Sequence, residues 1–251
     1  MSRIETIGNA TLYLCDCLEV MAGLPDASVD MILCDLPYGT TACKWDTVIP
    51  FEPLWAHYKR VIKRNGAIVL TASQPFTTAL ISSNMAMFKY CWVWDKVRGA
   101  NFATVGIRPF NAHEDIAVFY EFQPTYVAQK SVGKPYTQKQ GRVGESKQTG
   151  LYREDVVTTN SGDRHPLSIL RYSKESGYHP TQKPVALMEY LIRTYTQEGE
   201  TVLDNCMGSG TTGVACVNLA REFVGIEREP KYFDIACRRI DDAQRQPRFI
   251  A

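Results

Sequence analysis

The stretch DNCMGSGTTG, residues 204–213, decides the fold of this 251-residue chain. It follows a short β-branched and apolar run, residues 201–203, which predicts a strand. Residues 211–219 can continue from the glycines as a helix, and a second apolar strand, residues 223–226, ends on Glu227. A strand, a glycine-rich turn, a helix and a strand with a terminal acid therefore arrive in order.

Gly208, Gly210 and Gly213 match the pattern G-x-G-x-x-G. A turn of this kind lets a ligand come close to the backbone, and a carboxylate at the end of the next strand is placed for ribose hydroxyls. We interpret the stretch as the nucleotide-binding half of a Rossmann unit. Only 24 residues follow Glu227, too few for the rest of such a sheet, so the other strands come from the preceding part of the chain.

The preceding part of the chain alternates strand and helix patterns. Residues 29–34 and 67–71 are continuous apolar runs, which are typical of buried parallel strands, and residues 51–64 between them predict a helix. Two aromatic strands, residues 88–95 and 115–122, are expected to pair as an antiparallel edge. The pattern predicts an α/β fold with a mostly parallel sheet.

Composition narrows the class of protein. A hydrophobic content of 45% with 22% charged residues is typical of a soluble globular protein. No apolar run approaches the roughly 20 residues of a membrane span, and the N-terminus lacks a signal-peptide core. The eight cysteines are scattered without zinc-ligand spacing. We therefore expect a cytoplasmic protein with reduced thiols, no metal site and no membrane partner.

Charge is distributed unevenly along the chain. Residues 124–180 carry nine Lys and Arg against five acids, a net charge of +4, while the whole chain carries +1. Apolar periodicity also disappears there, so we expect a basic insertion, residues 124–178, within a domain formed by residues 1–123 and 179–251. The asymmetry favours a polyanionic partner, although a solvated loop produces the same pattern.

A second constellation, Asp35-Leu36-Pro37-Tyr38, follows the apolar run 29–34, at a strand end of the type where open α/β sheets bind ligands. An exocyclic amine is a poor nucleophile because its lone pair is delocalised. The Asp35 carboxylate and the Leu36 carbonyl can each accept one of its N–H groups, and Tyr38 can stack on a planar base. An ordinary strand-ending turn uses the same residue types.

With these two stretches, the chain resembles the amino-methylating DNA methyltransferases that use S-adenosylmethionine. The order is that of the permuted, beta-type members, in which the catalytic motif precedes the cofactor motif. Residues 35–38 are similar to the family's [D/N/S]-P-P-[Y/F/W], residues 204–212 to its D-x-F-x-G-S-G-T-T, and residues 179–184 to the segment before the cofactor strand. Leu36 and Met207 depart from the pattern, but leucine keeps the backbone carbonyl. Further matches are Arg108, His113, Glu114, Glu227 and Tyr232.

The resemblance implies a Rossmann-like class I methyltransferase fold, with the basic insertion as the target-recognition region on double-stranded DNA. The catalytic residues that it implies are Asp35, Leu36, Pro37 and Tyr38. The residues that it implies for S-adenosylmethionine are Asp16, Thr181, Lys183, Asp204, Cys206, Met207, Gly208, Ser209, Gly210, Thr211 and Glu227. The DNA-binding residues expected in the insertion are Lys130, Lys134, Lys139, Arg142, Lys147 and Arg153.

The function expected from the resemblance is methylation of a flipped base. Asp35 at the first motif position favours adenine N6, because serine is commoner there in cytosine-N4 enzymes. Cytosine N4, RNA and protein glutamine stay open as targets, and so does a non-catalytic relative that only binds nucleic acid. A dinucleotide-dependent oxidoreductase shares the glycine pattern but has no need of Asp35-Leu36-Pro37-Tyr38. Family members are often dimers, so a homodimer is also expected.

Overall fold

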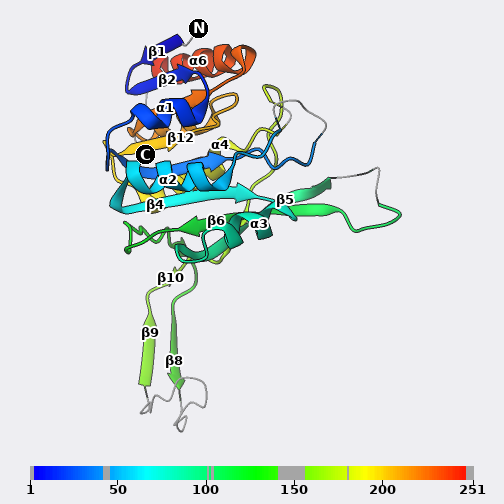
Figure 1. The fold of residues 1–251 in the computed structure, drawn as a ribbon. Helices are drawn as coiled ribbons and strands as arrows, with labels where there is room; N and C mark the ends of the chain where they lie inside the picture. The colour runs from blue at the N-terminus through cyan, green and yellow to red at the C-terminus, as the bar shows by residue number, and fades with distance from the viewer. Residues whose placement is uncertain are drawn as a thin grey trace. The chain divides into compact units, whose positions relative to one another are not determined.

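The computed structural model describes residues 3–41, 46–100, 102, 105–140, 156–179 and 181–246, without the side chains of residues 139, 140 and 156. The chain forms two compact units (Figure 1). The first unit joins residues 1–127 to residues 168–251, and the second consists of residues 128–167. The chain therefore leaves the first unit once and returns to it.

The first unit is built on a mixed sheet whose described strands follow the order β1-β2-β13-β12-β3-β4-β6-β5-β11 (Figure 1). Pairing is parallel from β2 to β4, whereas β6 is antiparallel to both β4 and β5. The bounds are β1 Arg3–Ile7, β2 Ala10–Leu14, β3 Val29–Asp35, β4 Ile62–Ala72, β5 Phe88–Ala100, β6 Asn111–Phe119, β11 Ile169–Arg171, β12 Thr201–Asp204 and β13 Glu222–Glu227. The predicted fold class is confirmed.

The two aromatic strands do pair with each other, as β5 and β6, but they do not end the sheet. The short strand β11 pairs in parallel with β5 and places Leu170 opposite Trp94. Leu170 is only 6% exposed, so its burial draws this segment into the sheet. Residues 168–178, which the sequence suggested as part of the insertion, accordingly belong to the first unit.

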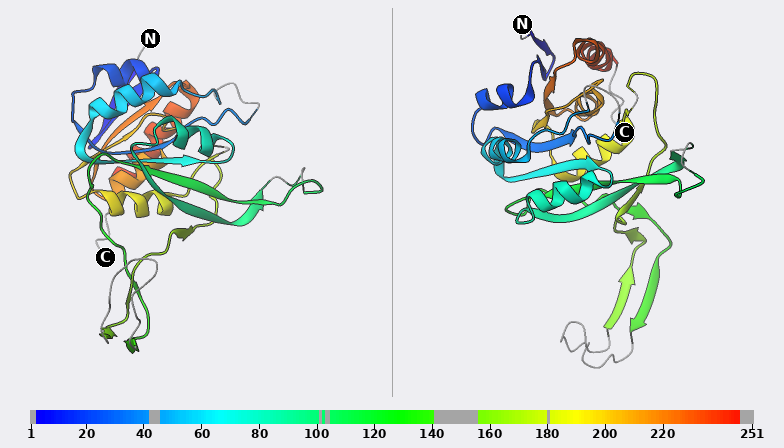
Figure 2. Two further views of the ribbon diagram at one scale, coloured as in Figure 1. Left: turned by 60° about the horizontal axis from the view of Figure 1, so that its bottom comes forward. Right: turned by 45° about the vertical axis from the view of Figure 1, so that its right-hand side comes forward.

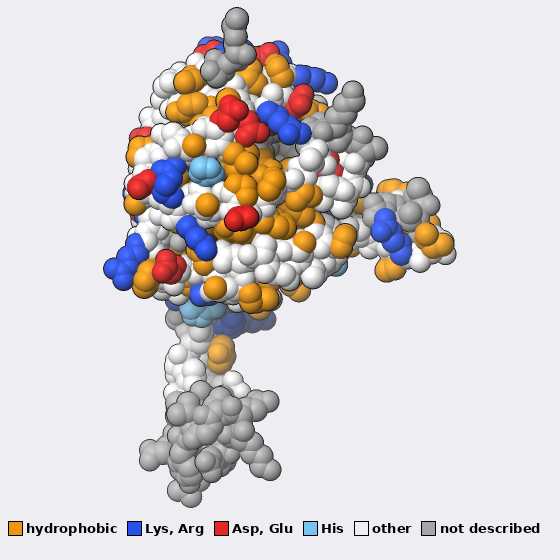
Figure 3. Space-filling view, viewed as in Figure 1, with side chains coloured by type: hydrophobic (Ala, Val, Ile, Leu, Met, Phe, Trp, Pro, Cys, Tyr) orange, Lys and Arg blue, Asp and Glu red, His pale blue; other side chains and the backbone are white. Residues whose placement is uncertain are grey.

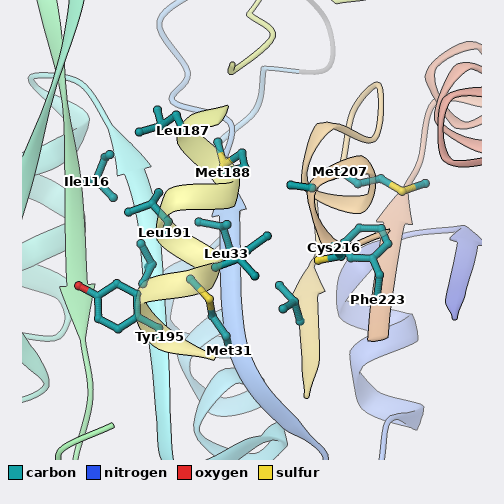
Figure 4. Packing of buried hydrophobic residues seen from close by; sticks show 14 of the residues in the cluster. Met31, Leu33, Ile116, Leu187, Met188, Leu191, Tyr195, Met207, Cys216 and Phe223 are labelled. Atoms are coloured by element: carbon teal, nitrogen blue, oxygen red, sulfur yellow. The ribbon is translucent and has the colours of Figure 1, made fainter. Parts of the chain in front are cut away.

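Helices cover both faces of the sheet (Figure 2). Side chains of β3 alternate between the faces: Ile32 and Cys34 pack with α1, α2 and α3, whereas Met31 and Leu33 pack with α4, α5 and α6 (Figure 4). This burial on both sides explains why β3 is a continuous apolar run. The helices are α1 Cys17–Gly23, α2 Phe51–Val61, α3 Phe76–Ser83, α4 Val185–Tyr195, α5 Thr211–Asn218 and α6 Pro230–Arg245.

The strand order reverses between β3 and β12, which pair directly through Val202 and Met31. From β3 the chain passes through α2 to β4 on one side, and from β12 it passes through α5 to β13 on the other. Such a switch point opens a crevice at the carboxyl ends of the strands. Asp35 and Asp204 are the last residues of these two strands and border that crevice.

The second unit contains regular structure that its irregular sequence did not predict. β7 (Ser131–Val132) pairs with β10 (Asp163–Arg164), and β8 (Tyr136–Gln140) pairs with β9 (Val156–Asn160), both antiparallel. Strands this short, with both faces polar, carry no apolar alternation that a sequence pattern could reveal. Within the ranges that the structure describes, no helix is long and apolar enough to cross a membrane.

A substitution at Gly213 in α5 would test how closely this helix packs against α6 and the sheet. A Cβ at Gly213 would lie 2.5 Å from Ile240 Cδ1 and 2.8 Å from Phe223 Cε1, both buried. Gly213→Ala should therefore lower the free energy of unfolding by about 1–3 kcal/mol, the usual effect of overpacking. Urea unfolding of the protein without cofactor measures it.

The matched control is Gly23→Ala at the exposed end of α1, where no atom of a described residue lies within 4 Å of the new Cβ. This change should leave stability within about 1 kcal/mol of wild type, on the stabilising side. Equal effects of the two substitutions would show that the α5–α6 contact is looser than described.

Candidate active site

One pocket lies at the carboxyl ends of the strands, with about 1200 Å³ of open space that is partly continuous with solvent. Every residue that the sequence assigned to catalysis or to the cofactor lines it, except Gly210. The lining residues among them are Asp16, Asp35, Leu36, Pro37, Tyr38, Thr181, Lys183, Asp204, Cys206, Met207, Gly208, Ser209, Thr211 and Glu227. Segments that are far apart in the sequence thus meet in one cavity.

The Asp35 carboxylate accepts hydrogen bonds on both oxygens. Tyr38 Oη donates to Oδ1 at 2.8 Å, Thr71 Oγ1 donates to the same oxygen, and Lys183 Nζ donates to Oδ2 at 2.7 Å. Burial raises the pKa of Tyr38 well above its usual value, and the neighbouring carboxylates of Asp35 and Glu114 raise it further. The phenol therefore stays protonated and acts as a donor to Asp35.

Lys183 connects Asp35 to a second carboxylate. Its Nζ also lies 3.2 Å from Glu114 Oε2, and Glu114 Oε1 lies 2.7 Å from Lys96 Nζ. The two lysine side chains are only 6% and 4% exposed. Two buried cations and two carboxylates thus alternate along one chain of contacts, which is the arrangement that buried charge requires.

The ionic chain shifts the pKa of its members. Burial by itself would lower the pKa of Lys183, but Asp35 and Glu114 outweigh it and raise that pKa above its usual value. Burial would likewise raise the pKa of Glu114, but Lys183 and Lys96 outweigh it and lower that pKa. At neutral pH Lys183 is therefore a charged hydrogen-bond donor and not a base.

The sequence did not reveal this ionic chain. Glu114 was among the residues that carried the family resemblance, without a role, and Lys96 had no signal at all because it lies beyond an aromatic strand pattern. Lys183 was assigned to the cofactor, yet its ammonium group is bound to Asp35. Strand pairing explains why Glu114 lies near Asp35: β6 runs antiparallel to β4, so β6 begins at the edge of the sheet where β3 and β4 end.

The loop after the catalytic motif is held by one carboxylate. Asp46 accepts from the backbone N–H of Gly39, Thr40 and Thr41 at 2.7–2.9 Å. Burial raises the pKa of Asp46, but these hydrogen bonds outweigh it and lower that pKa below its usual value. Asp46 and the two threonines line the pocket, so the carboxylate fixes the wall beside Tyr38.

The glycine turn has backbone conformations that favour glycine. Gly208 has φ +52° and Gly210 has φ +79°. A Cβ at Gly210 would also lie 2.8 Å from the Cβ of Ala236 in α6. Gly210 therefore sits under the turn at the start of α5 and supports Gly208 and Ser209, which face the pocket.

Glu227 ties the end of β13 to this turn. Its Oε2 accepts from Gly208 N at 2.9 Å and its Oε1 accepts from Glu229 N at 2.8 Å. Burial raises the pKa of Glu227, partly offset by these backbone donors. Each carboxylate oxygen can accept a second hydrogen bond, so the carboxyl group can also accept from a vicinal diol in the pocket.

Asp204 and Asp16, which were both assigned to the cofactor, have structural tasks in the pocket wall. Asp204 accepts from Thr212 Oγ1 at 2.6 Å and from Cys206 N at 3.1 Å. Burial raises its pKa to about 6 despite these donors. Asp16 caps α1 by accepting from Leu18 N at 2.9 Å. Asp16, Cys206 and Thr212 all line the pocket, so these contacts hold parts of its wall.

His179 is a pocket residue that the sequence placed in a motif without a function. Its ring packs edge to face on Tyr232, with 4.2 Å between centroids, and its Nδ1 accepts from Thr181 N at 3.2 Å. Burial lowers the pKa of His179. A neutral aromatic wall thus stands opposite Gly208, whose added Cβ would meet His179 at 3.9 Å. Among the described residues no group of His, Cys, Asp and Glu has a metal-binding arrangement.

Comparison with known proteins agrees with this geometry. The profile of an N6/N4 family described as DNA methylase matches residues 29–238. The chain belongs to this DNA methylase family. The Type II methyltransferase M2.MboI of Moraxella bovis is 26% identical to this methylase over 262 residues, which cover 92% of this chain and 87% of that protein.

Two solved structures are similar to this methylase. The M1.HpyAVI–SAM complex is 27% identical, with a TM-score of 0.62 over 92% of this chain and 99% of that chain. The PvuII DNA methyltransferase (cytosine-N4-specific) is 16% identical, with a TM-score of 0.68 over 98% and 89%, and shows the fold alone. The chain is accordingly an S-adenosylmethionine-dependent DNA amino-methyltransferase with a class I methyltransferase fold.

The pocket suits this cofactor. The left-handed turn at Gly208 leaves room for a ligand close to the backbone, and the partly buried Glu227 carboxylate at the next strand end can bind ribose hydroxyls. The aromatic wall of His179 and Tyr232 borders the same space. These donors, acceptors and apolar surfaces match a nucleoside with a charged tail.

Lys183 offers a stability test of the ionic chain. Lys183→Met leaves Asp35 and Glu114 close together with one cation fewer, so it should lower the free energy of unfolding by about 3–5 kcal/mol. Lys130→Met is the matched control, because the 3.3 Å ion pair of Lys130 with Asp163 joins side chains that are 44% and 54% exposed. This control should lower the free energy of unfolding by at most about 1 kcal/mol. Similar losses in urea unfolding would mean that Lys183 is solvated.

Asp204 offers a test by pH. Its pKa rises from 3.8 to about 6 on folding, so the folded chain binds the proton more tightly and loses stability as pH rises through that window. Asp204→Asn removes this loss. As pH rises from about 4 to 7, the free energy of unfolding of Asp204→Asn should increase by roughly 2–3 kcal/mol relative to that of wild type. A flat difference between Asp204→Asn and wild type across this pH range would contradict the assignment.

Proposed function

We propose that this methyltransferase modifies the N6 amine of adenine in double-stranded DNA, after the target base has left the helix. The observation that carries the proposal is the Asp35 carboxylate at the pocket edge, held from three sides by Tyr38, Thr71 and Lys183. A carboxylate positioned in this way can bind an amine in a single orientation. The sequence motif alone could not provide that orientation.

The number of hydrogen-bond acceptor positions on Asp35 supports its proposed role in binding the target amine. A carboxylate has about four lone-pair positions on its two oxygens. Described residues occupy two at Oδ1 and one at Oδ2. We assign the second position at Oδ2 to one N–H of the target amine and the Leu36 carbonyl to the other. Holding both hydrogens draws the nitrogen toward tetrahedral geometry, so that its lone pair becomes available.

Tyr38 is proposed to support the base with one face only. Its ring stacks on Phe76 with 5.1 Å between centroids and 24° between planes, so that face is covered. The target base would pack on the opposite face, while Pro37 shapes the turn that carries the ring. The Tyr38 hydroxyl bond to Asp35 keeps the stacking surface and the amine acceptor in a constant relation.

Cofactor contacts follow the pocket wall. We assign the ribose hydroxyls to Glu227, the adenine end to Asp16 and the methionine end to Thr181. S-adenosylmethionine, when bound, supplies an electrophilic methyl group. The other residues assigned to its binding line the turn or support it: Asp204, Cys206, Met207, Gly208, Ser209, Gly210 and Thr211. We place the Lys183 ammonium at the catalytic carboxylate, because its hydrogen bond is to Asp35.

Adenine is preferred over cytosine because an aspartate stands at the first motif position. Cytosine N4 remains the second candidate, since the same carboxylate and carbonyl can hold either amine. The basic second unit is proposed as the target-recognition region. Lys130 and Lys134 are exposed there. The side chains of Lys139, Arg142, Lys147 and Arg153 lie outside the described residues.

The test is transfer of a labelled methyl group from S-adenosylmethionine to unmethylated plasmid DNA, followed by separation of the nucleosides. Wild type should label N6-methyladenine, and Asp35→Ala should lose at least about 100-fold in rate, since it removes the amine acceptor. Asp26→Ala, an exposed ion-paired aspartate, is the control and should keep full activity.

Other outcomes of this assay are equally informative. Label in N4-methylcytosine would keep the mechanism and replace the base. Label only in RNA or in a protein glutamine would refute the DNA substrate. If Asp35→Ala kept wild-type activity while binding the cofactor normally, the role of Asp35 would be wrong.

A further inference from the structure

The hairpin formed by β5 and β6 extends beyond the catalytic edge of the sheet. The last pair between β4 and β6 is Ala72 with Asp115, next to the strand ends that carry Thr71 and Asp35. β5 and β6 continue outward, and their last pair joins Ala100 to Asn111. The end of the hairpin therefore projects from the same edge that holds the site (Figure 1).

Large apolar side chains gather at this end without being buried. Ile107 is 86% exposed, Phe102 75%, Val105 48% and Phe110 48%. The Phe102 and Phe110 rings contact each other at 5.2 Å between centroids. Apolar side chains are seldom clustered on a surface that faces only water. This cluster therefore indicates a binding surface.

The charge at this end indicates what it binds. Residues 97–112 contain Arg98 and Arg108 and no Asp or Glu. Both arginines are exposed, and Figure 3 shows basic and hydrophobic side chains together on the projecting part at the right. An apolar surface edged only by positive charge complements a polyanion with stacked bases. It would repel a second copy of itself.

Distance links this surface to the reaction. Lys96 and Glu114, at the base of the hairpin, belong to the ionic chain that holds Asp35. β5 bulges between Asp95 and Ala100, whereas β6 advances only two residues between the paired His113 and Asn111, so at about 3.3 Å per residue Ala100 lies roughly 7 Å beyond Asp95. A base that reaches Asp35 remains attached to its strand, so the rest of the duplex must lie within a few nucleotide lengths of this surface.

We propose that the end of the β5–β6 hairpin contacts DNA beside the extruded base. Ile107 and Phe102 cover the base step that the target has left, and Arg98 and Arg108 bind the flanking phosphates. Apolar wedges of this kind stabilise unstacked steps in other DNA complexes. The inference rests on the flipped-base mechanism proposed above and adds the group that compensates for lost stacking.

The test compares a target base that must be unpaired with one already unpaired. The target sequence is first mapped on plasmid DNA methylated by wild type. Methyl transfer is then measured on a short duplex with that site, either fully paired or with a mismatch opposite the target base. Phe102→Ala/Ile107→Ala should lose about tenfold or more in kcat/KM on paired DNA and less than about threefold on the mismatch, where extrusion is easier.

The matched control is Ile4→Ala/Met85→Ala, which removes side chains that are 58% and 60% exposed elsewhere on the first unit. It should leave both rates unchanged. Arg98→Ala/Arg108→Ala should reduce the slope of log K for DNA against log salt by about two, the value for two lost phosphate contacts. Cofactor affinity should stay at the wild-type value in all variants, which shows that the fold is intact.

The outcomes separate this inference from the proposed function. If wild type methylates DNA but the apolar variant loses activity equally on both duplexes, or on neither, the wedge is wrong and the function stands. A variant that changes the sedimentation coefficient without changing the paired-DNA rate would make the surface a contact between copies. If wild type labels no DNA, the proposed function itself fails.

Discussion

The ammonium group of Lys183 lies buried between Asp35 and Glu114, and Glu114 in turn holds the buried Lys96. A buried charge is tolerated only when its partners are in place, so these four residues have to be assembled together. They come from β3, from the segment before α4, from β6 and from β5. The arrangement of half the sheet is therefore coupled to the electrostatics of the catalytic edge, and the Asp35 carboxylate is oriented before any substrate arrives.

The switch point between β3 and β12 explains how a motif near the start of the chain acts with one near the end. Parallel pairing of Val202 with Met31 places Asp35 and Asp204 at neighbouring strand ends. The two aspartates then serve different purposes because their surroundings differ. Asp204 is buried and bonded to Thr212 and the Cys206 amide, so it supports the turn that faces the cofactor. Asp35 lies in an ionic chain at the pocket edge, where an amine can reach it. Motif order along the chain is immaterial once the sheet has formed.

The β5–β6 hairpin connects the ionic chain at Asp35 to an exposed apolar end. Its base carries Lys96 and Glu114, whereas its end exposes Ile107 and Phe102. The pairing of β5 with β6 joins this exposed end to the residues that hold the Asp35 carboxylate. We assign separate tasks to separate parts of the chain: cofactor binding to the pocket, contact with the duplex near the target base to the hairpin, and recognition to the basic residues of the second unit.

The sequence by itself determined the fold class and the family, and nearly all of the residues that it assigned to catalysis or to the cofactor line the pocket. Those features depend on local patterns: glycines at fixed spacing, continuous apolar runs for strands buried on both faces, and an acid at a strand end. It did not reveal that β11 extends the sheet beyond β5, because a three-residue strand with one buried leucine has no periodicity. Nor did it reveal the bond between Lys183 and Asp35, the ionic chain through Glu114 to Lys96, or the clamp of Asp46 on the catalytic loop. Only the tertiary structure decided these contacts, since strand register and loop closure set which charges meet, and neither is encoded in a short stretch of residues.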